Sequence, residues 1–137
     1  METNLPSVTP FLMFEGQAEA AMSFYTSLFP QSEIVSLSRY GPNEAGAEGS
    51  VMLAIFSLNG QEIMCIDSNV SHGFTFTPAM SLYVNCQTEA EVERLFEALS
   101  ADGEIMMPLQ AYPFSEKFAW VADRFGVSWQ INLARSV

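Results

Sequence analysis

The chain repeats one pattern of residues, and this repeat constrains its fold more than any other feature. Residues 16–29 read GQAEAAMSFYTSLF, and residues 86–99, a shift of 70 positions (86 − 16), read CQTEAEVERLFEAL. Both segments space their apolar residues at i, i+3, i+4 and i+7, as one face of an amphipathic helix does. The apolar face keeps its phase from one copy to the other. We therefore predict two helices related by internal duplication.

The residues around both helices are predicted to form strands, because short runs of β-branched and aromatic residues alternate there with turn residues. One strand precedes each helix, at residues 8–14 and 79–86. Three strands follow each helix, at 33–40, 50–58 and 61–68 in the first copy and at 104–108, 118–122 and 127–133 in the second. Asn59-Gly60 predicts a two-residue hairpin turn. Thr88 and Glu91 predict a capping box at the start of the second helix.

The predicted fold class is therefore α+β, with two βαβββ modules in one domain. A chain of 137 residues is long enough to bury the core of a single domain. The first module spans about residues 8–68 and the second about residues 79–133. The segment at 69–78 links the modules and carries His72, the only histidine of the chain.

The chain is strongly acidic, with 16 Asp and Glu residues against 5 Lys and Arg residues and a formal net charge of −11. Such a surface repels phosphate backbones and anionic lipids, so neither nucleic acid nor a membrane surface is expected as a partner. No apolar run reaches the roughly 20 residues that a membrane helix needs. The first ten residues, METNLPSVTP, lack the basic and apolar regions of a signal peptide. We expect a cytoplasmic protein.

The last predicted strand has one apolar face and one polar face. In DRFGVSWQINL, residues 123–133, Trp129 and Ile131 alternate with Ser128, Gln130 and Asn132. Successive side chains of a strand point to opposite faces, so the three polar side chains share one face. Gln130 could hold a metal ion, contact a ligand, or be a satisfied amide with no further role.

The duplicated pattern, with FYTSLF ending the first helix and DRFGVSWQINL near the end of the chain, resembles the vicinal-oxygen-chelate superfamily. That superfamily includes glyoxalase I, bleomycin-resistance proteins, fosfomycin-resistance enzymes and extradiol dioxygenases. The chain looks most similar to the PhnB-like branch, some members of which are labelled demethylubiquinone methyltransferase. This closer resemblance is carried by TPFLMFEGQAEAAMSFYTSLFP, SRYGPNEAGAEGSVMLAIFSLNGQEIMCIDS, FTFTPAMSLYVNC and YPFSEKFAWVADRFGVSWQINL. It implies sheets that curl around a cleft, and chains that pair as homodimers.

The resemblance also implies where a divalent metal ion would bind, namely at Pro10, Met64, Ala79 and Gln130. Proline and alanine side chains offer no donor atom, and a thioether is too soft for zinc, nickel, iron or manganese. Gln130 alone cannot hold the ion, because a catalytic site needs about three protein ligands. We therefore expect no metal ion and no other cofactor. A different strand register would favour a metal-dependent lyase or dioxygenase with ligands from Glu62, Asp67 or His72.

The residues do not support a methyltransferase. A site for S-adenosylmethionine commonly uses a Gly-x-Gly turn after the first strand of an alternating βα fold. The eight glycines of this chain never lie two positions apart. His72 lies beside Ser71 in the linker, where a solvated histidine is the common case.

Two functions remain open. The first is metal-free binding of a small, partly aromatic molecule in the cleft, whose rim the segment AYPFSEKFAWVAD (111–123) would suit. The second is a metal-independent enzyme that uses a cleft carboxylate for proton transfer. Cys65 lies in the apolar run EIMCID, so a buried, reduced thiol is expected. The candidate contact residues are Phe11, Arg39, Cys65, Asp67, Trp120 and Gln130.

Overall fold

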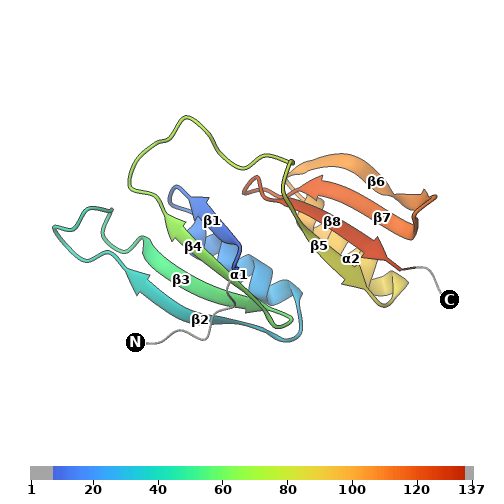
Figure 1. Ribbon diagram of the computed structural model, residues 1–137, viewed down its shortest axis with the longest axis horizontal. Coiled ribbons are helices and arrows are strands. Elements are labelled where there is room, and N and C mark those ends of the chain that lie inside the picture. The colour runs from blue at the N-terminus through green and yellow to red at the C-terminus, as the bar shows by residue number, and fades with distance from the viewer. Residues whose placement is uncertain (1–7, 135–137) are drawn as a thin grey trace. The chain divides into compact units, whose positions relative to one another are not determined.

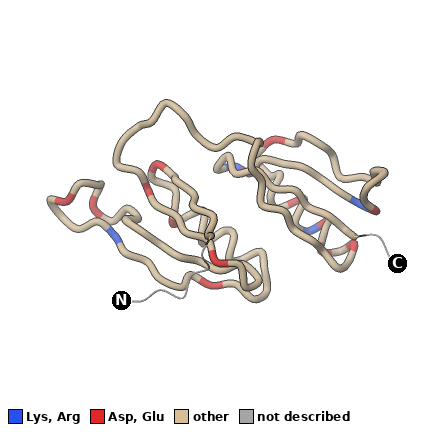
Figure 2. The backbone as a smooth tube through the Cα atoms, in the orientation of Figure 1, with Lys and Arg blue, Asp and Glu red and all other residues tan. Residues whose placement is uncertain are grey.

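A computed structural model describes residues 8–134 of the chain. The chain forms two compact units that divide between Phe74 and Thr75, within the predicted linker. In the described part of the chain, no helix has the length and apolar character that crossing a membrane requires. Acidic residues occur in both units, whereas basic residues are few (Figure 2).

The first unit consists of one helix and a four-stranded mixed sheet (Figure 1). Its elements are β1 (Phe11–Phe14), α1 (Ala18–Leu28), β2 (Ser32–Arg39), β3 (Val51–Leu58) and β4 (Gln61–Asp67). The strand order is β1-β4-β3-β2, in which β1 runs parallel to β4 and the other pairs are antiparallel.

The second unit repeats this arrangement. Its elements are β5 (Ser81–Cys86), α2 (Glu89–Ser100), β6 (Glu104–Tyr112), β7 (Ser115–Ala122) and β8 (Ser128–Leu133). The strand order is β5-β8-β7-β6, again with one parallel pair, β5 with β8. Each unit is thus one βαβββ module, so the predicted α+β fold with duplicated modules is confirmed.

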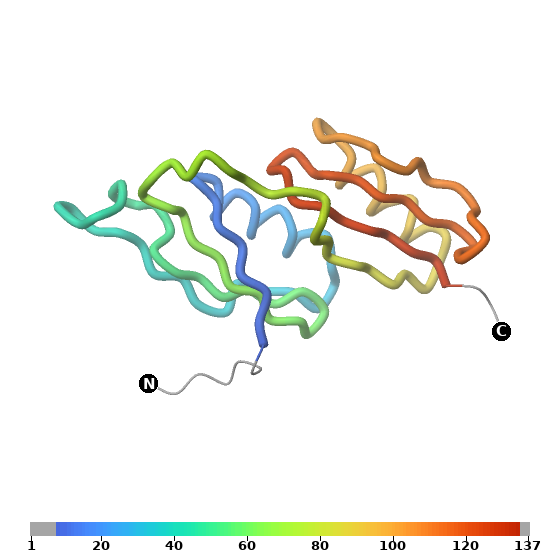
Figure 3. Tube along the Cα trace, turned by 45° about the horizontal axis from the view of Figure 1, so that its top comes forward, coloured from blue at the N-terminus to red at the C-terminus, as the bar shows by residue number. Residues whose placement is uncertain are grey.

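Each helix covers one face of the sheet of its own unit (Figure 3). In the first unit, Tyr25 of α1 is fully buried, and its ring centroid lies 6.2 Å from that of Phe56 on β3. In the second unit, Val92, Leu95 and Leu99 of α2 are fully buried, as their helical spacing predicts. Burial of these apolar side chains supplies the main driving force for folding each unit.

Local turn signals are confirmed, and the largest boundary errors lie in one hairpin. Asn59 and Gly60 join β3 to β4 with φ values of 49° and 91°, which suit a two-residue hairpin. The strands β6 and β7 extend beyond the predicted ranges 104–108 and 118–122. The sequence predicts that the first of these strands ends at Pro108. The strand continues past Pro108 because β6 is an edge strand, where the missing N–H of proline is tolerated.

Candidate functional site

The sheet of the second unit has one face that α2 does not cover. Lys117 of β7 forms ion pairs with Glu89 and Glu93 of α2, with Nζ–Oε1 distances of 3.0 and 2.8 Å. This contact places Lys117, and by alternation Ala119 and Val121, on the helix side. Because side chains alternate along a strand, Phe118 and Trp120 point to the opposite face.

We call this opposite face the open face of the second sheet. Strand register assigns to it Ser81, Tyr83 and Asn85 of β5, Ser128, Gln130 and Asn132 of β8, and Phe118 and Trp120 of β7. The Cα partners of Gln130 are Tyr83 on one side and Trp120 on the other. The structure therefore brings together two of the predicted contact residues, Gln130 and Trp120.

A chain of hydrogen bonds crosses the open face at one end of these strands. The indole Nε1 of Trp120 donates to Ser128 Oγ at 2.8 Å, and Ser128 Oγ lies 2.6 Å from Ser81 Oγ. The amide Nε2 of Gln130 donates to Ser81 Oγ at 3.2 Å. Ser128 is buried, whereas Ser81, Trp120 and Gln130 are half-buried. The polar side chains of β8 thus form part of a connected network.

The other end of the open face carries a cluster of aromatic rings. Phe118 is buried at its centre, and its ring centroid lies 4.9 Å from that of Phe114 and 6.3 Å from that of Tyr83. Tyr112 stacks on Phe114 with a centroid distance of 5.6 Å. Tyr83 and Phe114 are 52% and 58% exposed, so two apolar ring surfaces remain available for contact with another molecule.

The two tryptophans differ in environment. Trp129 lies on the helix side of β8, is 1% exposed, and donates its Nε1 hydrogen to Asp123 Oδ2 at 2.8 Å. Trp120 lies on the open face and is half-buried. A ligand on the open face would therefore contact Trp120 and leave Trp129 shielded by the sheet.

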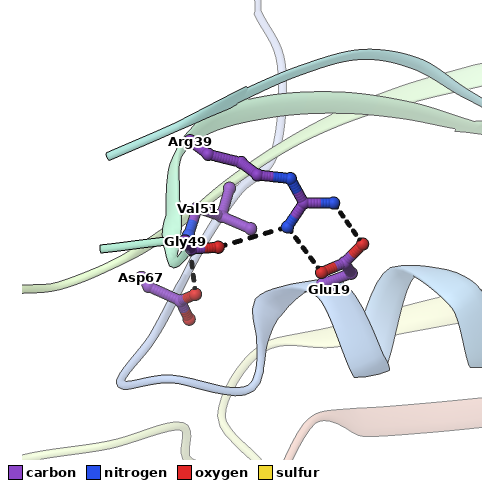
Figure 4. Close-up of polar contacts among 5 residues, drawn as sticks. All are labelled: Glu19, Arg39, Gly49, Val51 and Asp67. Atoms are coloured by element: carbon purple, nitrogen blue, oxygen red, sulfur yellow. Dashed lines mark hydrogen bonds and ion pairs between the residues drawn. The ribbon is translucent and has the colours of Figure 1, made fainter. Parts of the chain in front are cut away.

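Asp67 is held inside the first unit by backbone groups. Its Oδ1 accepts hydrogen bonds from the N–H groups of Gly16 and Ala18, at 2.8 and 2.9 Å. Its Oδ2 accepts from the N–H of Val51 at 3.0 Å (Figure 4). Asp67 is 4% exposed and caps the start of α1, where Gln17 provides no side-chain cap. A carboxylate is favourable there because the helix N-terminus carries a partial positive charge.

Arg39 links the loop between β2 and β3 to α1 by hydrogen bonds. Its guanidinium donates to both carboxylate oxygens of Glu19, at 2.7 and 2.5 Å, and to the carbonyl of Gly49 at 3.1 Å (Figure 4). The hydrogen bond to Arg39 lowers the pKa of Glu19, and the same bond raises the pKa of Arg39. Both side chains are more than 40% exposed, so the pair contributes little to stability.

Cys65 and Phe11 lie on opposite sides of the first sheet. Cys65 faces α1 with Asp67 and is fully buried. Burial raises the pKa of its thiol to about 12, and the negative charge of Asp67 adds to the effect. Such a thiol is not a nucleophile at neutral pH. Phe11 pairs with Met64 and is 50% exposed. Of these residues, only Phe11 lies on the side that a ligand of the uncovered sheet face could reach.

The sequence suggests Glu62 only as an additional metal ligand. It alternates with Ile63 and Cys65 along β4, so it shares the uncovered side with Met64. Its Oε2 atom is buried and has no hydrogen-bond partner among residues 8–134. Strand alternation along β4 could have placed Glu62 and Asp67 on opposite faces of the sheet from the sequence alone. That Glu62 Oε2 lacks a hydrogen-bond partner among the described residues is visible only in the structure.

The donor set does not fit a divalent metal ion. Met64 and Gln130 lie on uncovered sheet faces, while Pro10 offers only its carbonyl, which accepts from the N–H of Met64 at 2.9 Å. Ala79 offers a methyl group. Within the described range, no three His, Cys, Asp or Glu side chains gather in a way that could hold a metal ion. One amide and one thioether cannot compensate the charge of a dication.

His72 follows Ser71, which lines a cavity of the first unit. Its Nε2 is 2.7 Å from Ser68 Oγ, which also donates to the carbonyl of Val70 at 3.0 Å. The cavity, of about 310 Å³, is lined by loop residues that include Ser50, Asp67 and Ser68. Asp67 accepts hydrogen bonds from the N–H groups of distant residues, whereas Ser68 bonds to nearby loop residues, so these contacts hold the ends of the loop in place.

Comparison with known proteins places the chain among close relatives. The sequence model of the family described as 3-demethylubiquinone-9 3-methyltransferase matches residues 6–132. A solved structure from Bacillus cereus, a putative 3-demethylubiquinone-9 3-methyltransferase and PhnB protein, is 64% identical with a TM-score of 0.92, and the match covers 94% of this chain and 100% of that one. Protein YjdN of Escherichia coli (strain K12) is 25% identical over 142 residues, which cover 93% of this chain and 95% of YjdN.

More distant structures share the fold alone. The fosfomycin resistance protein FosX of Listeria monocytogenes is 14% identical with a TM-score of 0.64, and the match covers 98% of this chain and 96% of that one. A glyoxylase/bleomycin resistance protein/dioxygenase domain from Frankia sp. EAN1pec is 13% identical with a TM-score of 0.63, and the match covers 98% of this chain and 100% of that one. This chain therefore shares its duplicated βαβββ architecture with both of these structures.

Proposed function

Because this chain belongs to the 3-demethylubiquinone-9 3-methyltransferase family of PhnB-like proteins, a family built on the glyoxalase/bleomycin-resistance fold, we propose that it binds a small, partly aromatic molecule without a metal ion. The observation that carries the proposal is the open face of the second sheet. There Gln130 lies between Tyr83 and Trp120, so a polar group is flanked by two aromatic rings. Binding sites for small molecules combine apolar walls with a few placed polar groups in this way.

The site chemistry supports binding more than methyl transfer or metal catalysis. The central residues of the open face, Ser81, Tyr83, Trp120, Ser128 and Gln130, are uncharged, and none is an activated nucleophile. A neutral ligand suits them, because a charged group would lose its hydration without gaining an ion pair.

Glu62 favours a second candidate function, a metal-independent enzyme. A carboxylate with one buried, unpartnered oxygen on an uncovered sheet face can accept a proton from a bound substrate. This role falls to Glu62 instead of Asp67, because Asp67 is engaged by three backbone N–H groups. The two functions are distinguished by turnover: an enzyme converts the compounds that stabilise it, and Glu62→Gln abolishes that conversion.

The test of binding is a thermal-shift screen against small aromatic and amphipathic compounds, followed by fluorescence titration of the compound that stabilises the protein most. We expect Trp120→Phe to weaken that binding about tenfold and to remove most of the fluorescence change. Trp129 is an internal control, since it is buried on the helix side. A fluorescence change that persists in the variant would assign the signal to Trp129 and contradict the proposed site.

We expect the protein, purified without tags or chelators, to contain no stoichiometric divalent ion. Chelation with EDTA should leave its melting temperature unchanged, and Gln130→Glu should not create metal binding, because one carboxylate cannot replace three missing ligands. Elemental analysis is the measurement. Close to one zinc, nickel, iron or manganese ion per chain would contradict the metal-free assignment.

We propose that the protein is a symmetric homodimer. The strands β2 and β6 lie at the edges of their own sheets and expose Val35 and Ile105, which are 47% and 50% exposed. Isologous pairing of two chains would cover such edges. Light scattering should give twice the chain mass of 15.1 kDa. The mass of a single chain at working concentration would exclude the dimer.

A further inference from the structure

The direction of one hydrogen bond on the open face follows from the chemistry of its partners. An indole N–H can only donate, so Ser128 Oγ accepts from Trp120 Nε1. Ser128 is 1% exposed, and its own hydroxyl hydrogen therefore needs an acceptor within the protein. Among the described residues, Ser81 Oγ, at 2.6 Å, is the partner that remains. Ser128 thus donates to Ser81.

This direction leaves the hydrogen of the Ser81 hydroxyl available. Ser81 Oγ already accepts from Ser128 and from Gln130 Nε2, and a hydroxyl oxygen has two lone pairs. Its hydrogen has no acceptor in the part of the chain that the structure describes. Ser81 is half-buried on the open face, so its hydroxyl presents a hydrogen-bond donor to a bound molecule.

Gln130 presents the complementary group. Its Nε2 donates to Ser81, while its Oε1 accepts no hydrogen bond from residues 8–134. The Ser81 hydroxyl, a donor, and Gln130 Oε1, an acceptor, are adjacent, because a hydrogen bond joins the two side chains. A group that offers a carbonyl oxygen beside an N–H would satisfy both.

We infer that the open face recognises a neutral aromatic carboxamide: the ligand carbonyl accepts from the Ser81 hydroxyl, the ligand N–H donates to Gln130 Oε1, and the ring packs against Trp120 and Tyr83. The inference rests on the proposed binding function and adds the chemical class of the ligand. Carboxylates are disfavoured, because a carboxylate cannot donate to Gln130 and the chain carries a net charge of −11.

The experiment uses the intact protein and three probes of similar shape: benzamide, methyl benzoate and benzoate. Dissociation constants are measured by NMR titration for the wild type, Ser81→Ala, Gln130→Leu and the control Ser100→Ala, which removes a hydroxyl from α2. We expect benzamide to bind most tightly and benzoate most weakly. Ser81→Ala should weaken both benzamide and methyl benzoate about tenfold, whereas Gln130→Leu should weaken benzamide alone, because only benzamide donates an N–H. Ser100→Ala should change neither.

The outcomes separate this inference from the proposed function. Benzamide binding that is insensitive to Ser81→Ala and Gln130→Leu would overturn the inference, as would tighter binding of benzoate. If benzamide fails to bind while other aromatic compounds of the screen change the Trp120 fluorescence, the carboxamide inference is wrong but the proposed binding site is supported. If no compound perturbs Trp120, the proposed function itself fails. Circular dichroism checks the fold of each variant, and either variant alone suffices for the test.

Discussion

Replacing Asp67 with alanine is expected to lower the free energy of unfolding of the first unit by about 3 kcal/mol or more. The substitution removes the acceptor of three backbone N–H groups, those of Gly16, Ala18 and Val51. Each buried donor left without a partner costs about 1–3 kcal/mol. The loss is large beside the 5–15 kcal/mol that typically separates folded from unfolded protein. Urea denaturation followed by circular dichroism measures it.

Two further variants control this result. Asp67→Asn keeps an oxygen for Gly16 and Ala18 but turns an amide N–H group toward the N–H of Val51, so we expect an intermediate loss. Glu33→Gln removes one negative charge from an exposed position of the same unit and should have little effect. A loss for Asp67→Ala no larger than that for Glu33→Gln would show that the carboxylate does not hold α1 and β3 together.

Replacing Asp123 with alanine is expected to destabilise the second unit to a similar extent. Asp123 is 3% exposed, and its Oδ1 accepts from the N–H groups of Phe125 and Val127 at 2.8 and 3.1 Å. Its Oδ2 accepts from the indole of Trp129 at 2.8 Å. We expect a loss of about 3 kcal/mol. Trp120 and Trp129 both belong to the second unit, so urea denaturation followed by fluorescence measures this loss directly.

The controls for Asp123 use the fact that its two carboxylate oxygens have different partners, backbone N–H groups for Oδ1 and the Trp129 indole for Oδ2. Asp123→Asn retains an oxygen for the turn but places an N–H group against the Trp129 indole, so it should lose less stability than Asp123→Ala while changing Trp129 emission. Asp102→Asn removes a charge from an exposed residue whose φ of 58° asparagine tolerates, and it should be nearly neutral. Equal effects of Asp123→Ala and Asp102→Asn would contradict the assigned role of Asp123.

The two helix caps explain which features of the fold could be predicted from the sequence. The cap of α2 is local: Thr88 Oγ1 accepts from the N–H of Glu91 at 3.1 Å, and Glu91 Oε1 accepts from the N–H of Gln87 at 2.9 Å. Residues three or four positions apart reveal such a motif. The cap of α1 comes from Asp67, which is 49 positions from Ala18. No local pattern indicates that contact, and the sequence alone therefore suggests Asp67 as a ligand-contacting residue.

For the candidate site, as for the helix caps, the sequence predicts the local features but not the long-range contacts. Alternation along DRFGVSWQINL correctly separates the polar from the apolar side chains of β8, because it depends only on neighbouring residues. The partner of Gln130 is Ser81, which is 49 positions away, so the network that fixes its amide follows only from the register of β5 with β8. The sequence suggests Cys65 as a contact residue, whereas alternation along β4 places its side chain with that of Ile63 toward α1.

An NMR titration of the metal-stripped protein, with the compound that stabilises it most in the screen, tests most directly whether the open face of the second sheet binds a ligand without a metal. We predict that chemical-shift changes concentrate on the Trp120 indole N–H and on the backbone of residues 81–85 and 128–132, with saturation in the presence of EDTA. Shift changes confined to the first unit, or binding that appears only after a divalent ion is added, would contradict the account.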